Sequence, residues 1–152
     1  MKNVIKTLAV ALCAALTFGL TGCSKDAEDL IIGKWDLLEA ISTTTVSGTG
    51  TEYDGTMTDT TTFKEGEASF TFNEDNTVVI YSVDEETGEP STETGTYTLN
   101  DKKLILSSNG RSNEMTIIEI SKKEMTLNTT MSMSEDGASM TMSVDMRFKK
   151  AK

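Results

Sequence analysis

The side chains of this sequence that could do chemistry are acids, methionines and a cysteine. Histidine is absent from all 152 residues, so no imidazole can move a proton, activate a nucleophile or complete the usual zinc sites. Catalysis would have to rely on two carboxylates of separated pKa, as in glycoside hydrolysis. Most acids, such as Glu74-Asp75 and Glu135-Asp136, fall in expected turns, and no pair stands out. We therefore expect no enzymatic activity and no cofactor.

Four methionines alternate with polar residues in two segments, Met131-Ser132-Met133 and Met140-Thr141-Met142. If residues whose numbers sum to 273 pair across a hairpin, each methionine lies opposite another. Four thioethers on facing strands suit a soft cation such as Cu(I). Methionine also fills irregular interiors, and this ordinary role in a core or an adaptable apolar pocket is favoured here. The sequence therefore predicts no metal site.

Cys23 ends a stretch with the three parts of a secretory signal peptide. Lys2 and Lys6 make a basic start, residues 7–20 are almost wholly apolar, and small residues follow. This stretch is too short to span a bilayer as a mature helix. The run Leu20-Thr21-Gly22-Cys23 resembles a bacterial lipobox, which implies cleavage before Cys23 and its acylation. Two or three chains, such as palmitate, would anchor the protein stably, because one chain binds a membrane only marginally.

Ser24 follows this cysteine where inner-membrane retention signals usually carry Asp. We therefore expect an outer-membrane lipoprotein of the cell envelope, on the periplasmic or the surface face. The charged residues 25–29 are equally well explained as a solvated tether, since short charged linkers extend by self-repulsion. The chain divides into a signal peptide (1–22), a lipidated tether (23–31) and one domain (32–152).

The charge of the mature chain argues against nucleic acid as a partner. Removing residues 1–22 removes two lysines and no acid, so 14 basic and 24 acidic side chains become 12 and 24, a net charge of −12. Such a surface repels phosphates and anionic headgroups. Cys13 leaves with the signal peptide and Cys23 is used for acylation, so the domain has no disulfide.

Short β-prone segments, interrupted by turn residues every 8 to 12 positions, predict an all-β domain, with a helical turn only near residues 26–32. Alternating apolar residues predict four hairpins: Phe70 and Phe72 with Ile80 and Val78, Tyr97 and Leu99 with Leu106 and Leu104, Ile118 and Ile120 with Leu127 and Met125, and residues 125–133 with 140–148. Short connections without crossover helices indicate an antiparallel up-and-down meander. Closure into a barrel of eight to ten strands would hide its edges.

Threonine occupies ten of the twenty positions from 43 to 62, with glycine at 48, 50 and 55. Threonine suits strands and glycine weakens pairing. We interpret this segment as a long second strand or a strand pair beside a loop. A binding rim, or a site for O-linked sugar near Asp59-Thr60-Thr61, is the less favoured alternative.

Gly33-Lys34-Trp35, at the start of the first strand, resembles the Gly-x-Trp signature of the lipocalins and their calycin relatives. The likeness extends to bacterial lipocalin-like lipoproteins through Phe70-Thr71-Phe72-Asn73 and residues 95–99. This resemblance implies a barrel that binds a small, mostly apolar molecule. It also implies that an arginine from a late strand crosses the tryptophan, and Arg147 is the candidate.

The resemblance and the alternation together give a set of side chains expected to face the barrel interior, with core packing or a rim position as the competing explanation for each. A filled interior would instead indicate an envelope interaction or structural protein without a small ligand. The candidates for ligand contact are Trp35, Glu39, Phe70, Phe72, Tyr97, Met131, Met133, Met140 and Met142.

Overall fold

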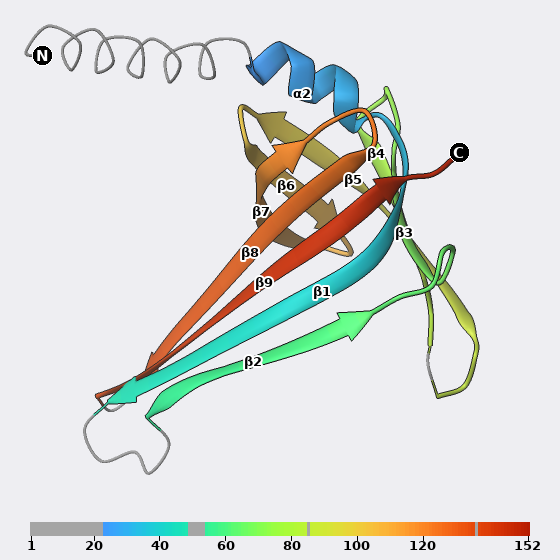
Figure 1. Ribbon diagram of the computed structural model, residues 1–152. Helices are drawn as coiled ribbons and strands as arrows, with labels where there is room; N and C mark the ends of the chain where they lie inside the picture. The colour runs from blue at the N-terminus through green and yellow to red at the C-terminus, as the bar shows by residue number, and fades with distance from the viewer. Residues whose placement is uncertain (1–22, 49–53, 85, 136) are drawn as a thin grey trace, which may run out of the picture.

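A computed structural model describes residues 23–48, 54–84, 86–135 and 137–152, and the predicted signal peptide lies outside these ranges. One helix and nine strands follow one another in the described chain (Figure 1). They are α2 (Cys23–Ile31), β1 (Gly33–Gly48), β2 (Gly55–Thr62), β3 (Ala68–Phe72), β4 (Thr77–Val83), β5 (Pro90–Asn100), β6 (Lys103–Ser108), β7 (Arg111–Ile120), β8 (Glu124–Glu135) and β9 (Ala138–Lys150).

Eight of the strands close into a barrel. Consecutive strands from β3 to β9 pair antiparallel, β1 pairs with β3, and the β1–β9 pairing completes the ring. Within the described residues, β2 pairs with β1 alone and stays outside the ring. The predicted antiparallel up-and-down barrel is confirmed, with eight strands in the ring.

Most of the predicted hairpin registers are confirmed. Phe70 lies opposite Ile80, Tyr97 opposite Leu106, and Met133 opposite Met140. The Asn76 backbone adopts the left-handed conformation, with φ of 63°, that the turn between β3 and β4 requires. Alternation of apolar side chains therefore identified the correct partners wherever the strands are regular.

The prediction that Ile118 pairs with Leu127 is wrong, because β7 contains a bulge. Ile117 lies opposite Leu127, and the register shifts before Glu119. A bulge places two residues of one strand against one of its partner, so the alternation changes phase. As a result Ile117 is buried and Ile118 is exposed on the outer face.

A second bulge breaks the alternation of β1. Leu37 lies opposite Phe148 and Glu39 opposite Arg147, so Leu38 is the extra residue. Trp35 and Leu37 are buried, whereas Glu39 turns to the face that carries Arg147. The expectation that Glu39 faces the barrel interior is therefore wrong, and the cause is one inserted residue.

Helix α2 covers one end of the barrel, which we call the closed end. The Trp35 indole N–H donates to the Ile31 carbonyl oxygen at 2.7 Å. The Lys150 ammonium donates to the carbonyl oxygens of Leu30 (2.8 Å) and Ile32 (2.6 Å). These bonds satisfy carbonyls that a helix leaves without partners at its C-terminus. The helical turn expected near residues 26–32 overlaps this helix, in which Ala27 and Ile31 are buried, and the lipidated tether at 23–31 stays a prediction.

Lys150, rather than Arg147, lies over the tryptophan of the Gly-x-Trp run, with its ammonium 4.6 Å from the Trp35 ring centroid. Lys150 lies directly opposite Trp35 in the β1–β9 register. Arg147 is three residues earlier in β9. It lies opposite Glu39 and points to the other face of the sheet from Trp35. Burial lowers the pKa of the Lys150 ammonium. The expectation that Arg147 crosses the tryptophan is therefore wrong.

Three barrel strands extend past the barrel and, together with β2, form a four-stranded sheet that we call the wing. It consists of residues 40–48 of β1, all of β2, residues 129–135 of β8 and residues 138–145 of β9, in the order β8-β9-β1-β2. Figure 1 shows it projecting away from the end that carries α2. The threonine-rich segment thus contains a strand pair, and its predicted loop falls mostly outside the described residues.

Candidate functional site

The two ends of the barrel differ because alternate turns lie at opposite ends of an up-and-down barrel. The turns after β3, β5 and β7 lie near α2, those after β4 and β6 lie at the other end, the mouth, and the turn after β8 lies beyond the mouth at the tip of the wing. A cavity of about 550 Å³ opens at the mouth. Its side chains form an apolar floor, Phe70, Val78, Ile80, Leu106 and Met115, and a polar rim, Glu93, Ser107, Ser108, Asn109, Arg111 and Asn113.

Phe70, in the floor of the mouth cavity, packs against two further aromatic side chains. The Phe70 ring lies 5.1 Å from the Phe148 ring and 6.2 Å from the Phe72 ring, centroid to centroid. Phe72 and Phe148 are almost completely buried, as are Trp35 and Leu127. The closed half of the barrel is therefore packed with side chains, and the mouth half leaves room.

Hydrogen bonds hold the rim of the mouth cavity. The Asn109 side-chain amide donates to the Glu93 carboxylate at 2.9 Å, and the Ser108 hydroxyl donates to the Thr94 carbonyl oxygen at 3.2 Å. A Cβ at Gly95 would collide with the carbonyl oxygen of Ser107, so glycine is what allows β5 and β6 to approach here. The rim thus offers a carboxylate, amides and hydroxyls above an apolar floor.

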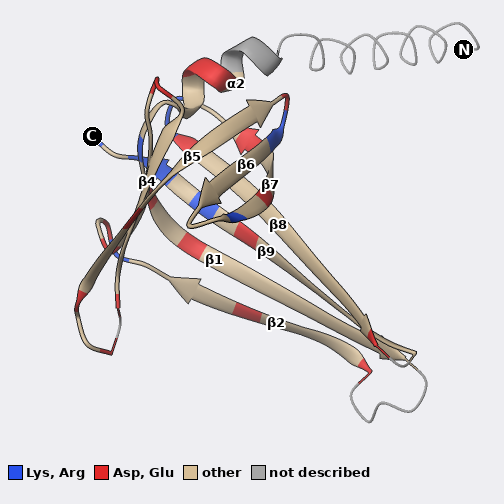
Figure 2. Ribbon diagram, turned by 180° about the vertical axis from the view of Figure 1, so that it is seen from behind, with Lys and Arg blue, Asp and Glu red and all other residues tan. Residues whose placement is uncertain are grey.

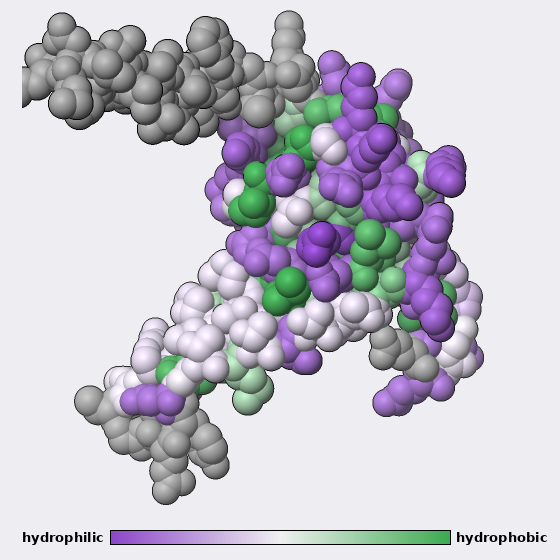
Figure 3. Space-filling view, viewed as in Figure 1, coloured by the Kyte–Doolittle hydropathy of each residue, from purple (hydrophilic) through white to green (hydrophobic). Residues whose placement is uncertain are grey.

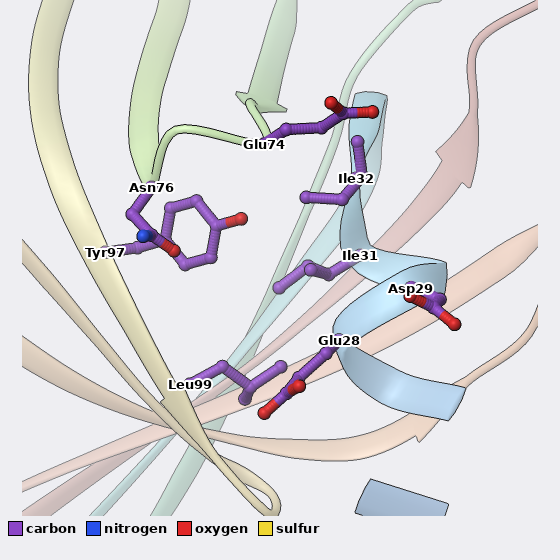
Figure 4. Close-up of a pocket in the computed structure, with 8 residues that line it drawn as sticks. All are labelled: Glu28, Asp29, Ile31, Ile32, Glu74, Asn76, Tyr97 and Leu99. Carbon is purple, nitrogen blue, oxygen red and sulfur yellow. The ribbon is translucent and has the colours of Figure 1, made fainter. Parts of the chain in front are cut away.

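A second cavity, of about 600 Å³, opens beside α2 at the closed end. Figure 4 shows Tyr97 and Leu99 of β5 on one side, and Ile31 with the acidic residues of α2 on the other. The Tyr97 hydroxyl donates to the Asn73 carbonyl oxygen at 3.0 Å. Burial, and secondarily the Asp75 carboxylate, raise the pKa of Tyr97. The carboxylates of Glu28, Asp29 and Glu74 make this cavity a poor place for an apolar or anionic molecule.

The aromatic candidates for ligand contact occupy three different places. Phe70 lines the mouth cavity, and Tyr97 lines the cavity beside α2. Trp35 and Phe72 are fully buried in the packed closed half. Glu39 accepts a hydrogen bond from the Arg147 guanidinium at 2.9 Å on the outer face. Ligand contact by the aromatic candidates stays a prediction, and the structure does not gather them into one site.

The four methionine candidates lie on the wing, outside the barrel. Met131 lies opposite Met142, and Met133 opposite Met140, as the hairpin prediction required. Their expected burial is wrong: Met131 is 63% exposed and Met133 is 60% exposed. The reason is that β7 pairs with β8 only as far as Asn128, so no strand curls over the rest of β8.

Sequence reasoning missed Met115 and the polar rim as parts of the site. Met115 and Ile117 share one alternation and Ile118 and Ile120 share another, so the segment supports two phases. Before the bulge the strand follows the first alternation, and after it the second. Periodicity alone could not have shown at which residue the change occurs. Rim residues such as Glu93 and Arg111 carried no signal beyond their place near turns.

The described residues contain neither a helix long and apolar enough to cross a membrane nor a group of three or more His, Cys, Asp or Glu side chains placed to hold a metal ion. Cys23 is the first residue of α2. The mouth cavity combines an apolar floor with polar groups at its rim, a composition typical of small-molecule sites.

A family model described as a lipocalin-like domain matches residues 31–127. The chain belongs to this lipocalin-like family. The match includes the Gly33-Lys34-Trp35 run, so the family resemblance of that run is confirmed. A comparison with curated protein sequences found no match.

Solved structures similar to this lipocalin-like chain include lobster apocrustacyanin A1, at 12% identity and a TM-score of 0.52, covering 84% of this chain and 64% of that one. An uncharacterised protein from Bacteroides eggerthii is 14% identical, with a TM-score of 0.47, covering 79% of this chain and 98% of that one. A triple mutant of bovine odorant-binding protein is 15% identical, with a TM-score of 0.43, covering 80% and 74%. The likeness to apocrustacyanin supports the barrel fold alone.

Proposed function

We propose that this lipocalin-like domain binds a small, mostly apolar molecule in its mouth cavity. The observation that carries the proposal is an apolar floor beneath a hydrogen-bonded polar rim. Small-molecule sites are typically concave and mostly apolar, with a few polar groups that fix orientation, and have volumes of about 300–1,000 Å³. The mouth cavity, at about 550 Å³, has this size and composition.

Apolar fluorescent probes and a panel of fatty acids, retinoids and sterols test this proposal. Ile80→Trp adds bulk at the floor of the mouth cavity and should weaken binding, since Ile80 lines that cavity. Ile118→Trp places the same side chain on the exposed outer face and is the matched control. Bound ligand should also raise the unfolding temperature, because binding to the folded state stabilises it by mass action. Equal binding by both variants would contradict the mouth site.

The second candidate is an envelope interaction protein whose barrel is a stable platform. The packed closed half, with Trp35, Phe72 and Phe148 almost fully buried, is the observation in its favour. Native mass spectrometry of protein purified from its own envelope separates the two functions. A co-purifying small molecule favours ligand binding, whereas a bare chain that also ignores the probe panel favours the platform.

We also propose that Cys23 is acylated and holds the domain at the outer membrane of a cell envelope. The apolar stretch that ends in Leu20-Thr21-Gly22-Cys23 supports this proposal. Because α2 begins at Cys23 and covers the closed end, the anchor would leave the mouth directed away from the membrane. Cys23→Ser should release the protein or leave it unprocessed. Unchanged membrane fractionation of that variant would contradict the lipid anchor.

A further inference from the structure

One face of the wing carries a cluster of thioethers that the barrel does not use. Met131, Met133, Met140 and Met142 form two directly opposed pairs on neighbouring strands. Successive side chains of a strand point to opposite faces, so all four share a face. We call this cluster the methionine square.

The spacing of the square allows its four sulfurs to meet. Directly opposed residues of antiparallel strands have Cβ atoms about 4.5–5.5 Å apart. Residues two apart along a strand are separated by about 6.7 Å. Methionine is unbranched and has three rotatable side-chain bonds, so each thioether can swing toward the centre. On the opposite face, the hydroxyls of Ser132 and Thr141 lie 3.2 Å apart, within hydrogen-bonding distance across the same pair of strands.

Exposure removes the usual explanation of these methionines. A core role would require burial, yet Met131 and Met133 are mostly exposed and Met142 is 36% exposed. Met140 is half-buried, so no member of the square is sealed in a core. An ion from solvent can therefore reach the sulfurs without any opening of the fold.

The charge around the square favours a cation. No Lys or Arg lies in the wing residues, and Figure 2 shows no basic residue coloured there. Glu135, at the end of β8, alternates onto the same face as Met133. The whole chain has a net charge of −10. The thioethers are neutral and lie in negatively charged surroundings, so they do not repel a cation. They carry no ionisable proton, so none has to be released before a cation binds.

We infer that the methionine square is a binding site for a soft monovalent cation, Cu(I). Soft thioether ligands select Cu(I), whereas carboxylates and carbonyls suit Mg²⁺ and Ca²⁺, and imidazole suits Zn²⁺. Each thioether donates a lone pair to the ion, which is bound without change of oxidation state. The inference is independent of what the barrel holds, because the square lies on the wing.

The test is titration with Ag(I), a redox-stable probe of the same softness, followed by Cu(I) under reducing conditions in competition with a chelator. The full chain carries Cys13→Ser and Cys23→Ser, so that no thiol competes. One ion per chain should bind, with similar affinity at about pH 3 and pH 7, because thioethers need not lose a proton whereas carboxylates are mostly protonated at the lower pH. Binding that disappears at the lower pH would overturn the site, since it would point to carboxylates.

The decisive variant replaces all four methionines of the square by leucine. Leucine keeps the apolar surface and volume and removes only the sulfur, so the fold should persist. Loss of outer-shell partners alone weakens metal sites by about 10–100-fold, so loss of all four ligands should weaken binding by at least about 100-fold. Met57→Leu is the control, because Met57 is an exposed methionine of the wing on β2, outside the square.

Methionine methyl NMR signals keep the test informative even if the quadruple variant misfolds. On addition of Ag(I) to the unsubstituted protein, the methyl signals of the square should shift and those of Met57, Met115 and Met125 should not. Uniform shifts, equal binding by the quadruple variant, or an equal loss on Met57→Leu would each overturn the inference.

Discussion

The two halves of β8 and β9 share one alternation of side chains and meet opposite environments. In the barrel half, Leu127 is fully buried and Phe148 is almost so. In the wing half, Met131 and Met133 continue the same face of β8 and are mostly exposed. In the view of Figure 3, the wing is mostly pale, whereas the barrel mixes strongly hydrophobic and strongly hydrophilic side chains. β8 and β9 pair with each other along both halves, so the difference in burial comes from what covers this face of the two strands.

The covering depends on how far the neighbouring strands reach. In the barrel, β7 continues the sheet from β8, and the ring turns the apolar face toward the opposite wall. Past Asn128, β8 has lost that neighbour, while β2 extends the sheet on the far side of β1. A sheet with two open faces cannot bury either of them. The alternation of apolar residues along a strand thus determines which face their side chains occupy. Whether those side chains are buried depends on how far the neighbouring strands extend beside them.

The largest expected effect is a contrast between two truncations on one face of β8. Leu127→Ala should lower the free energy of unfolding by about 2–5 kcal/mol, because it leaves a cavity in a packed core. Met131→Ala, four residues along, should change it by about 0.5 kcal/mol or less, since the side chain is mostly exposed. Urea denaturation of both variants measures the contrast. Similar costs would show that something covers the wing in solution.

Before the structure, alternation could predict the all-β class, most hairpin registers and the up-and-down barrel. It could not predict the bulges at Leu38 and Ile118, because a single inserted residue leaves no mark on composition. Those bulges decide that Glu39 faces outward and Met115 faces the mouth. The site was only partly predictable for a second reason: burial of the methionines depends on where β7 stops pairing, which is a tertiary property.

The next contrast compares neighbouring lysines at the closed end. Lys150→Met removes the donors to the Leu30 and Ile32 carbonyl oxygens and should cost about 1–2 kcal/mol, because those helix carbonyls lose their partner. Lys149→Met, on the exposed neighbour, should cost about 0.5 kcal/mol or less. Denaturant unfolding monitored by Trp35 fluorescence reports the stability of this end. Equal effects would mean that α2 is not held by Lys150.

A smaller effect is expected where barrel and wing join. The Arg147 guanidinium lies 2.9 Å from the Glu39 carboxylate, on the polar outer face, and Arg147 is mostly exposed. A double-mutant cycle with Glu39→Gln and Arg147→Gln should give a coupling energy of about 0.2–1 kcal/mol, as is usual for exposed ion pairs. The coupling should fall in high salt, which screens exposed charges. A coupling of several kcal/mol would show that the pair is shielded from solvent, and that the solvent-excluded part of the barrel reaches into the wing.

The finest contrast is between turns. The wing-tip turn contains Gly137 at φ of 82°, whereas the β3–β4 turn of the barrel is held by a carboxylate. The Thr77 hydroxyl donates to the Asp75 carboxylate at 2.6 Å, and this bond, followed by one from the Thr77 backbone N–H at 3.0 Å, lowers the pKa of Asp75 below its usual 3.8. Protonation therefore favours the unfolded chain.

Because the pKa of Asp75 is lower in the folded protein than in the unfolded chain, its stabilising effect is complete above pH 3.8 and is lost as pH falls through the folded pKa. Thr77→Val removes the hydroxyl and should raise the Asp75 pKa toward 3.8, measured by NMR titration of the carboxyl carbon. Asp84 is the internal control, since its pKa is lowered by hydrogen bonds from Thr87 in a different turn and should not move. A shift of both residues would indicate loosening of the whole barrel, whereas a shift of Asp75 alone shows that its turn is stabilised by local side-chain bonds.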